Sequence, residues 1–450
     1  MKTIDEISAQ DVQSIIKKHM IGDGYNLVLD FEKSHGTRLH DAKHGTEYLD
    51  FFTFFASNPL GLNHPKLADN EPFKKKILGP ALNKPSNSDV YTREMADFME
   101  IFDRIGIPEY LPHCFFISGG ALAVENALKV AFDWKVQKNF QKGYRKEIGH
   151  KVLHLDKAFH GRTGYTMSLT NTDPVKTRYF PKFDWPRITN PSVKYPLNEK
   201  NIEKTIAHEE RAISQARNYF KIYKDEIAAI ILEPIQGEGG DNHFRLEFHR
   251  ALRDLADEHE ALFIYDEVQT GVGLTGSFWA HEHFVKPDIL AFGKKAQVCG
   301  ILTGKRVDEV EKNCFNVSSR INSTWGGNLV DMVRFGRILE IIEEEDLIDN
   351  AKKAGQHLLK GIQEIAQDFD YIDNARGKGL FCAFDLPDTH SRDAVVDACF
   401  QQNLLILPCG EKTIRFRPPL IITTDDIDQG LNILKQSIRS AMQQCPAISK

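Results

Sequence analysis

Apolar and polar positions alternate through the middle of the chain in a pattern of strands followed by helices. Apolar runs of strand length occur at residues 114–117, 151–156, 228–234 and 262–267. Between them, apolar residues recur at three- and four-residue spacing, most clearly at 123–134 and 245–259. This alternation predicts a mostly parallel β-sheet that is covered by helices on both faces.

The pattern changes from about residue 329 onward. A long helical stretch at 329–369 precedes short strand-like runs at 379–386, 404–409 and 413–423. These elements predict a second, smaller α+β domain, which a chain of 450 residues is long enough to form. We expect a large domain over 66–328 and a small domain over 329–450, to which residues 1–65 contribute. The polar segment 186–226 is expected to be surface helix and loop.

Chemically distinctive side chains follow the predicted strands. Asp266 ends one apolar run, and Lys294 follows another at 287–293. Ligands of parallel sheets bind beyond the carboxyl ends of the strands, so these two side chains can face one cofactor. Pyridoxal phosphate needs a lysine for its imine and a carboxylate beside its pyridinium nitrogen. Taken singly, Lys294 also fits a solvated loop charge and Asp266 a turn or helix cap.

A phosphate site is predicted at residues 118–121. The apolar run 114–117 leads into this small-residue turn, and the helical pattern of 123–134 follows it. The start of a helix presents free backbone N–H groups and the positive end of the helix dipole to an anion. Glycines allow the backbone to approach that anion closely.

Segments along the chain resemble the class III (omega-amino) aminotransferases of the pyridoxal phosphate fold type I superfamily. They are FISGGALAVENALK, AFHGRTGYTMSLTNTDPVKT, LEPIQGEGGDNHF, IYDEVQTGVGLTG, PDILAFGKKAQVCG, INSTWGGN and TIRFRPPL. The resemblance implies an α/β fold, with a large domain on a mostly parallel sheet and a small α+β domain. It implies pyridoxal 5'-phosphate as the cofactor. Thr324 resembles the threonine that reaches the phosphate of the neighbouring subunit, which implies a homodimer with shared active sites.

The resemblance assigns further roles around the cofactor. Lys294 resembles the lysine that carries the cofactor, whereas the adjacent Lys295 receives no role. Asp266 resembles the partner of the pyridinium nitrogen. Gln269 resembles the partner of the ring hydroxyl, and Phe159 the aromatic residue that stacks on the ring. The residues that resemble the phosphate cup are Ser118, Gly119, Gly120 and Ala121.

Two arginines, Arg162 and Arg415, resemble the family's carboxylate anchors, a role that suits the planar guanidinium. Glu238 resembles the residue that masks Arg415 during the first half-reaction. KKAQVCG, STWGGN and RFRPPL resemble the members that transfer the ε-amino group of L-lysine to 2-oxoglutarate. Ornithine, 4-aminobutyrate and acetylornithine stay open as donors, because a side chain such as Asn322 can decide substrate length. Outside the family, Arg415 and Arg417 also fit a solvated strand edge.

A dinucleotide-binding dehydrogenase is a second hypothesis. Gly271, Gly273 and Gly276 form a G-x-G-x-x-G run after a strand, with Asp288 downstream. Such a run should open a helix, but residues 276–287 are short and end in proline. A non-enzymatic binding or regulatory protein of the same fold is a third hypothesis. The presence of the lysine, the aspartate and both arginines argues against it.

Composition narrows the classes of function further. A net charge of −6 provides no basic surface for nucleic acid. The start MKTIDEISAQDV lacks the features of a signal peptide, and no apolar run approaches membrane-spanning length. The 7 cysteines are scattered and never in C-x-x-C spacing, which predicts reduced thiols and no metal site. We therefore expect a cytoplasmic protein that binds small molecules and neither nucleic acid nor membrane.

Overall fold

The structure, a computed structural model, describes residues 7–444. Cys445 and the first six residues, on which the prediction about a signal peptide partly depends, lie outside this range. Within it, the cysteines are free thiols, and no helix is long and apolar enough to span a bilayer. The same residues contain no group of three histidine, cysteine or acidic side chains arranged to hold a metal ion.

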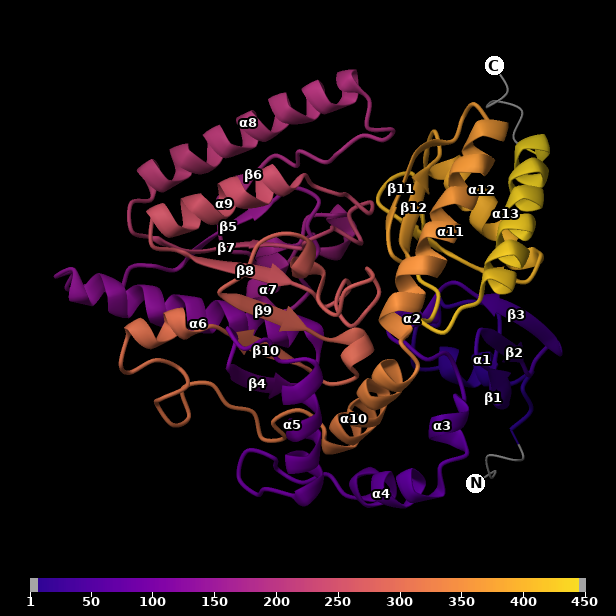
Figure 1. Ribbon diagram of the computed structural model, residues 1–450, viewed down its shortest axis with the longest axis horizontal. Coiled ribbons are helices and arrows are strands. Elements are labelled where there is room, and N and C mark those ends of the chain that lie inside the picture. Colours follow the sequence, from indigo (N-terminus) through magenta and orange to yellow (C-terminus); the bar gives the residue numbers. More distant parts are fainter. Residues whose placement is uncertain (1–6, 445–450) are drawn as a thin grey trace.

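A 7-stranded sheet forms the centre of the larger part of the molecule (Figure 1). Its strand order is β4-β10-β9-β8-β7-β5-β6. β10 is antiparallel to both neighbours, and the other pairs are parallel, which confirms the expected mostly parallel sheet. The strands are β4 (His113–Ile117), β5 (Lys151–Leu155), β6 (Arg187–Ile188), β7 (Ile227–Leu232), β8 (Leu262–Asp266), β9 (Ile289–Phe292) and β10 (Cys299–Thr303).

Helices cover both faces of this sheet, because its strands are apolar on both sides. On one face, α6 (Gly120–Gln141) and α7 (Gly164–Leu169) share a core with Ile264 of β8. On the opposite face, α8 (Glu199–Ile222) and α9 (Leu246–Glu258) share a core with Phe263 and Tyr265 of the same strand. α5 (Arg93–Ile105) and α10 (Leu329–Glu344) pack on each other, and Phe102 and Phe335 of these helices share a core with Phe292.

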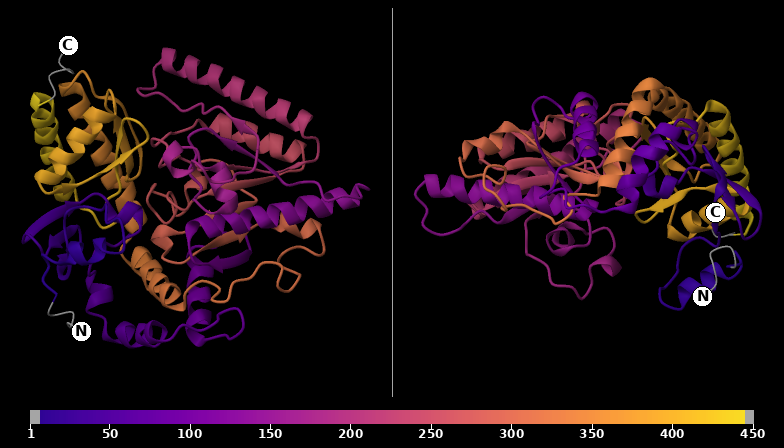
Figure 2. Two further views of the ribbon diagram at one scale, coloured as in Figure 1. Left: turned by 180° about the vertical axis from the view of Figure 1, so that it is seen from behind. Right: turned by 90° about the horizontal axis from the view of Figure 1, so that it is seen from below.

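Two 4-stranded sheets lie in the smaller part of the molecule, on the side away from α6 and α8 (Figure 1, Figure 2). In the sheet β1-β2-β3-β13, the C-terminal strand β13 is parallel to the N-terminal strand β3. The antiparallel sheet β11-β12-β15-β14 is covered by helices. The strands are β1 (Leu29–His35), β2 (Arg38–Asp41), β3 (Thr46–Asp50), β11 (Asp373–Lys378), β12 (Phe381–Asp385), β13 (Leu404–Leu405), β14 (Leu407–Cys409) and β15 (Thr413–Phe416), and the helices are α11 (Leu347–Asp368), α12 (Thr389–Gln401) and α13 (Thr424–Gln444).

Short helices and turns connect these layers. Helices near the N-terminus are α1 (Val12–Lys17), α3 (Pro65–Ala68) and α4 (Glu71–Leu82). The segment α2 (Thr53–Ala56) has positive φ throughout and is a left-handed turn. The 3-10 turns are η2 (Pro174–Lys176), η3 (Ala280–His283), η4 (Lys294–Ala296) and η5 (Lys305–Glu309).

The structure divides two elements that the sequence pattern joins. The helical stretch 329–369 is two helices, α10 and α11, because Asp346 between them has a left-handed φ of 49°. The apolar run 404–409 splits between two sheets, since β13 pairs with β3 and β14 with β15. The two-residue strand β6 lies within the segment expected as helix and loop, and it is too short to give a periodic signal. The domain boundaries near residues 65 and 328 remain a prediction.

The parallel strands of the large sheet end at one edge, and the loops at this edge carry the candidate residues. Phe159 follows β5, Glu238 follows β7, Gln269 follows β8, and Lys294 follows β9. The turn after β4 leads directly into α6. The G-x-G-x-x-G run also lies at this edge, but it leads into the 3-10 turn η3 rather than an α-helix, so the dinucleotide-binding hypothesis is wrong.

Candidate active site

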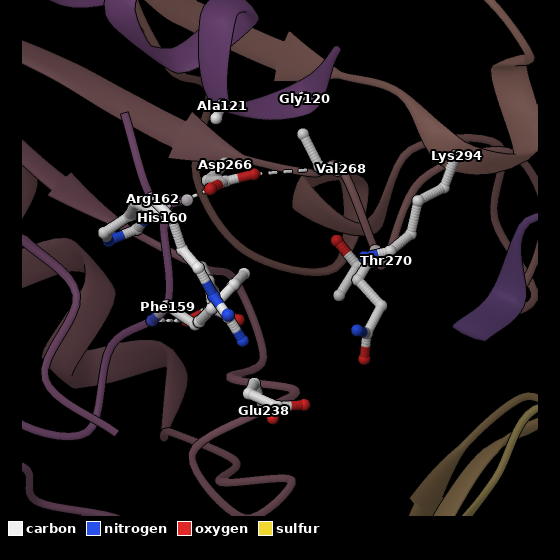
Figure 3. Close-up of a pocket in the computed structure, with 13 residues that line it drawn as sticks. Gly120, Ala121, Phe159, His160, Arg162, Glu238, Asp266, Val268, Thr270 and Lys294 are labelled. Atoms are coloured by element: carbon white, nitrogen blue, oxygen red, sulfur yellow. Dashed lines mark hydrogen bonds and ion pairs between the residues drawn. The ribbon is translucent and has the colours of Figure 1, made fainter. Parts of the chain in front are cut away.

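A cavity of about 320 Å³ opens at the carboxyl edge of the large sheet (Figure 3). Its walls come from loops that are far apart in the sequence. Six of the residues that border it are Gly120, Phe159, Glu238, Asp266, Gln269 and Lys294. The fold therefore brings the predicted lysine, carboxylate, aromatic and anion-binding residues around one space.

Lys294 presents a free amine to this cavity. The residue has a left-handed φ of 51°, just after β9. Gly293 is required before it, because an added Cβ would come within 2.8 Å of the Cys299 sulfur. Burial lowers the pKa of the Lys294 amine, and the Arg415 guanidinium lowers it further. Within residues 7–444 the amine makes no hydrogen bond or ion pair, so it is available to a carbonyl compound.

Asp266 is a buried carboxylate at the end of β8, with 5% of the residue exposed. One oxygen accepts a hydrogen bond from the Val268 N–H at 3.1 Å. The other lies 2.8 Å from Nδ1 of His160. His160 is buried, and its Nε2 has no hydrogen-bond partner. Sequence reasoning missed His160, although it directly follows Phe159 in the FHGRT segment.

The helix start at α6 supplies the anion site. Gly119 precedes the helix with φ 115°, and no side chain caps it, so the N–H groups of the first turn stay free. Gly120 and Ala121 border the cavity, whereas Ser118 and Gly119 form the turn that leads to them. An added Cβ at Gly120 would come within 2.8 Å of Val268, so this wall needs glycine.

A buried glutamate joins two of the loops around the cavity. Glu233 accepts hydrogen bonds from the N–H groups of Phe159 (3.0 Å) and Gly237 (2.9 Å). Burial raises its pKa to about 7. A Cβ at Gly237 would lie 2.1 Å from Oε1 of Gln269, so the amide of Gln269 would have to shift to admit one. Glu233 was not predicted, because a glutamate at the end of an apolar run has no distinctive sequence signal.

Gln269 lies against two buried arginines, Arg415 in β15 and Arg417 directly after that strand. Its side-chain oxygen accepts a hydrogen bond from Nη2 of Arg417 at 3.0 Å and lies 3.4 Å from Nη1 of Arg415. Arg417 also pairs with Asp241 at 2.6 Å and stacks on Phe381. The two arginines are 1% and 0% exposed, so the interpretation as a solvated strand edge is wrong.

The charged groups at the mouth of the cavity are unequally paired. Glu238 accepts a hydrogen bond from Nη2 of Arg415 at 2.6 Å and another from the Lys176 ammonium at 2.6 Å. Burial raises the pKa of Glu238, but Arg415 and Lys176 outweigh burial and bring it below its ordinary value. Arg162 borders the cavity and is exposed, and its guanidinium has no ion-pair partner among the described residues. Sequence reasoning missed Lys176.

Two predicted residues lie away from the cavity of their own chain. Asn322 and Thr324 are exposed in the loop before α10. Trp325 beside them is 44% exposed, with the Lys84 ammonium 3.5 Å from the centre of its ring. Their roles in substrate binding and in a neighbouring subunit remain predictions.

This set of groups fits pyridoxal phosphate. The free Lys294 amine matches the aldehyde, the buried Asp266 carboxylate matches the pyridinium nitrogen, and the start of α6 matches the phosphate. The ring of Phe159 and the side chain of Gln269 border the space between them.

Comparisons with known proteins agree with this assignment. The model of the aminotransferase class-III family matches residues 21–438. The L-lysine-epsilon aminotransferase of Amycolatopsis lactamdurans is 52% identical over 435 residues, which cover 96% of each chain. The protein of the same name from Mycobacterium tuberculosis H37Rv is 52% identical over 433 residues, or 96% of this chain and 95% of the relative. The solved lysine aminotransferase from M. tuberculosis in the internal aldimine form has a TM-score of 0.95 and 50% identity, and covers 97% of this chain and 100% of that one.

Proposed function

We propose that this chain, which belongs to the class III aminotransferases, transfers the ε-amino group of L-lysine to 2-oxoglutarate. Class III aminotransferases depend on pyridoxal phosphate. The products are L-glutamate and 2-aminoadipate 6-semialdehyde, which should cyclise to a six-membered imine. The relatives at 52% identity are named for lysine and its ε position.

The observation that supports this regiochemistry is the occupation of Arg415 by Glu238. An amino donor brings one carboxylate into the site. Glu238 masks Arg415 at 2.6 Å, whereas Arg162 has no partner within residues 7–444. The α-carboxylate of L-lysine therefore binds at Arg162, and its far end, the ε-amine, extends toward Lys294. An α-amine would need its carboxylate at Arg415, next to the reacting centre.

Each residue near the cofactor site has a task in this reaction. When bound, pyridoxal phosphate supplies an electron sink and carries the amino group between the two substrates. Lys294 would hold it covalently, and Asp266 would keep a proton on its ring nitrogen. Because its pKa is lowered, the Lys294 amine can be neutral and take a proton from the ε-carbon of lysine. The N–H groups at the start of α6 would hold the phosphate.

The second substrate needs both arginines. 2-Oxoglutarate has two carboxylates, and its keto group must lie where the ε-amine of lysine reacted. We propose that Glu238 leaves Arg415, which then binds the α-carboxylate, while Arg162 binds the side-chain carboxylate. A guanidinium suits each of these contacts because it donates two parallel hydrogen bonds.

A panel of amino donors with 2-oxoglutarate as the acceptor tests the proposal. L-lysine should be the preferred donor, and its product should give a coloured adduct with 2-aminobenzaldehyde whose mass corresponds to a six-membered ring. A five-membered product formed from ornithine at much higher efficiency would move the assignment to an ornithine aminotransferase. A 2-keto-6-aminohexanoate product would overturn the distal-amine mechanism.

We also propose that the enzyme is a homodimer with shared active sites. Thr324 is exposed and lies outside the cavity of its own chain. A hydroxyl that presents itself to a neighbouring copy can complete the anion site of that copy, as the resemblance implies. This arrangement would make the dimer necessary for activity.

A further inference from the structure

One carboxylate at the mouth of the cavity is shared by two cations. Oε2 of Glu238 accepts from Nη2 of Arg415, and Oε1 accepts from the ammonium of Lys176, both at 2.6 Å. Lys176 is the last residue of η2, 62 residues before Glu238 in the sequence. The carboxylate therefore has a second cation available whenever it gives up the first.

The ammonium of Lys176 is fixed in place rather than free in water. Its side chain is 14% exposed. Besides Glu238, it lies 3.3 Å from the hydroxyl of Thr172 and 5.3 Å from the centre of the Phe159 ring. Ordering a lysine side chain costs conformational entropy, so a fixed ammonium with three such contacts differs from an ordinary surface charge.

The charges of the two substrates make a second cation necessary. 2-Oxoglutarate needs Arg415 and Arg162 for its two carboxylates. Glu238 must then leave Arg415, and without another partner it would remain a half-buried carboxylate beside a dianion. Such a charge is costly to leave unpaired and would repel the substrate. With Lys176 as its partner, Glu238 is neutralised, and both arginines are free for the substrate.

We propose that Lys176 is a positioning residue that keeps Glu238 off Arg415 while 2-oxoglutarate is bound. This inference depends on the proposed function, since it concerns the second half of the same reaction. During the lysine half-reaction Glu238 bridges both cations, in the arrangement that the structure shows. During the 2-oxoglutarate half-reaction Glu238 keeps the contact with Lys176 and gives up the contact with Arg415. Lys176 thereby favours the binding of 2-oxoglutarate over the binding of L-lysine.

The two half-reactions of the holoenzyme, followed separately by rapid mixing and cofactor absorbance, test this role. Lys176→Met keeps the aliphatic stem and removes the charge. It should raise the dissociation constant for 2-oxoglutarate about tenfold or more, as expected for loss of a charge-assisted contact, and change that for L-lysine by less than about twofold. Lys176→Gln should behave in the same way, and Lys176→Arg should restore 2-oxoglutarate binding.

A matched control lies in the same loop. The Lys182 ammonium donates to the carbonyls of Thr177 and Phe180 and makes no contact with Glu238. Lys182→Met should leave both dissociation constants unchanged. In a Glu238→Gln background, Lys176→Met should no longer affect 2-oxoglutarate, because the carboxylate to be held is gone. Calorimetric binding of glutarate, an unreactive dicarboxylate, should show the same loss in Lys176→Met without any turnover.

Three results would overturn the proposal. Equal weakening of L-lysine and 2-oxoglutarate would make Lys176 a general attractor of carboxylates. An effect on L-lysine alone would reverse its assigned role. Unchanged binding of both substrates would leave Lys176 with a structural role only. Failure of the proposed function is a separate result, because the unaltered enzyme would then prefer another donor or give a different product from L-lysine.

Discussion

Glu238 is held in its charged form by its neighbours, and in the proposed reaction this charge determines which end of a donor reacts. Arg415 and Lys176 together outweigh the effect of burial on its pKa, so the carboxylate stays ionised. In the proposed reaction, Glu238 keeps the carboxylate of a donor away from Arg415 for as long as it occupies that guanidinium. The proposed selectivity of the donor step thus depends on one internal ion pair.

Glu238→Gln should relax the choice of donor. The amide keeps the size of the side chain but lacks the charge that masks Arg415, so α-amino acids can place their carboxylate there. We expect the ratio of kcat/KM for α-amino donors to that for L-lysine to rise about tenfold. The products from lysine, separated by mass after trapping, should now include 2-keto-6-aminohexanoate. An unchanged ratio would show that the pair with Arg415 does not control regiochemistry.

At the scale of elements, the left-handed turn 53–56 is tied to the segment that carries Lys294. Left-handed backbone costs about 1–2 kcal/mol for each residue with a side chain, and φ is 40–63° throughout this turn. The Thr53 hydroxyl donates to the Arg417 carbonyl at 2.6 Å. The Lys295 amine donates to the Ala56 carbonyl at 3.3 Å. These contacts hold the N-terminal turn against the active-site loop despite its backbone cost.

Lys295, to which the sequence assigned no role, connects these elements. Its amine donates to the carbonyls of Gln269 (2.7 Å) and Ala56, and burial lowers its pKa well below the ordinary value. Lys295→Met should leave both carbonyls without a partner and lower the free energy of unfolding by about 2–4 kcal/mol. Urea denaturation measures this loss.

A surface lysine provides the control for that change. The side chain of Lys360 on α11 is 75% exposed, and Lys360→Met should change the free energy of unfolding by less than about 0.5 kcal/mol. Borohydride reduction should attach the cofactor to Lys294 in both variants. A label on Lys295 would contradict the assignment of the two lysines.

At the scale of the whole molecule, the proposed shared site predicts complementation between inactive subunits. Lys294→Ala and Thr324→Asp should each abolish or strongly reduce activity. After mixing and random reassembly, about a quarter of the parent activity should return, because half of the dimers are mixed and each has one intact site. Lys294→Ala mixed with Asp266→Asn is the control. Each change inactivates the cavity of the chain that carries it, so a mixed dimer has no intact site. A fully active monomer in sedimentation would refute the shared site.

The stability of the whole molecule should fall steeply in acid. Burial lowers the pKa of His154, His243 and His249 to about 3. In the unfolded chain a histidine binds a proton below about pH 6.5, whereas the buried histidines stay neutral down to about pH 3. Between these values each buried histidine therefore lowers the free energy of unfolding as the pH falls. Burial raises the pKa of Glu209 and Glu233 to about 7. Between about pH 4.5 and 7 these carboxyls are protonated in the folded chain and ionised in the unfolded chain, so their effect on the free energy of unfolding is opposite to that of the histidines. Below that window the carboxyls are protonated in both states, and the histidine effect is unopposed.

His249→Gln tests this balance. The amide can still reach the hydroxyl of Tyr265, which lies 2.7 Å from Nδ1 of His249, but it does not titrate. Between pH 4 and 6, the fall in the free energy of unfolding should be smaller in the variant by about 1.4 kcal/mol per pH unit. Above pH 7 the two proteins should have the same slope, which serves as an internal control. Equal slopes in acid would contradict the assignment of His249 as a buried neutral side chain.

The sequence by itself determined the class of fold, the family and the residues nearest the cofactor site. The reason is local: apolar periodicity specifies strands and helices, and parallel strands end at one edge. Lys294 and Asp266, each at the end of an apolar run, therefore had to lie near each other. The turn from β4 into α6 was evident for the same reason, because the signal is continuous along the chain.

The tertiary structure alone decided which distant side chains complete the site. His160 meets Asp266 across 106 residues, and Lys176 meets Glu238 across 62. A lone histidine or lysine in a loop has no periodic pattern, so its partner is set only when the loops pack. The division of residues 404–409 between two sheets is of the same kind, since each half follows the strand beside it. Local pattern specifies elements, whereas contacts between loops depend on how those elements close around the cavity.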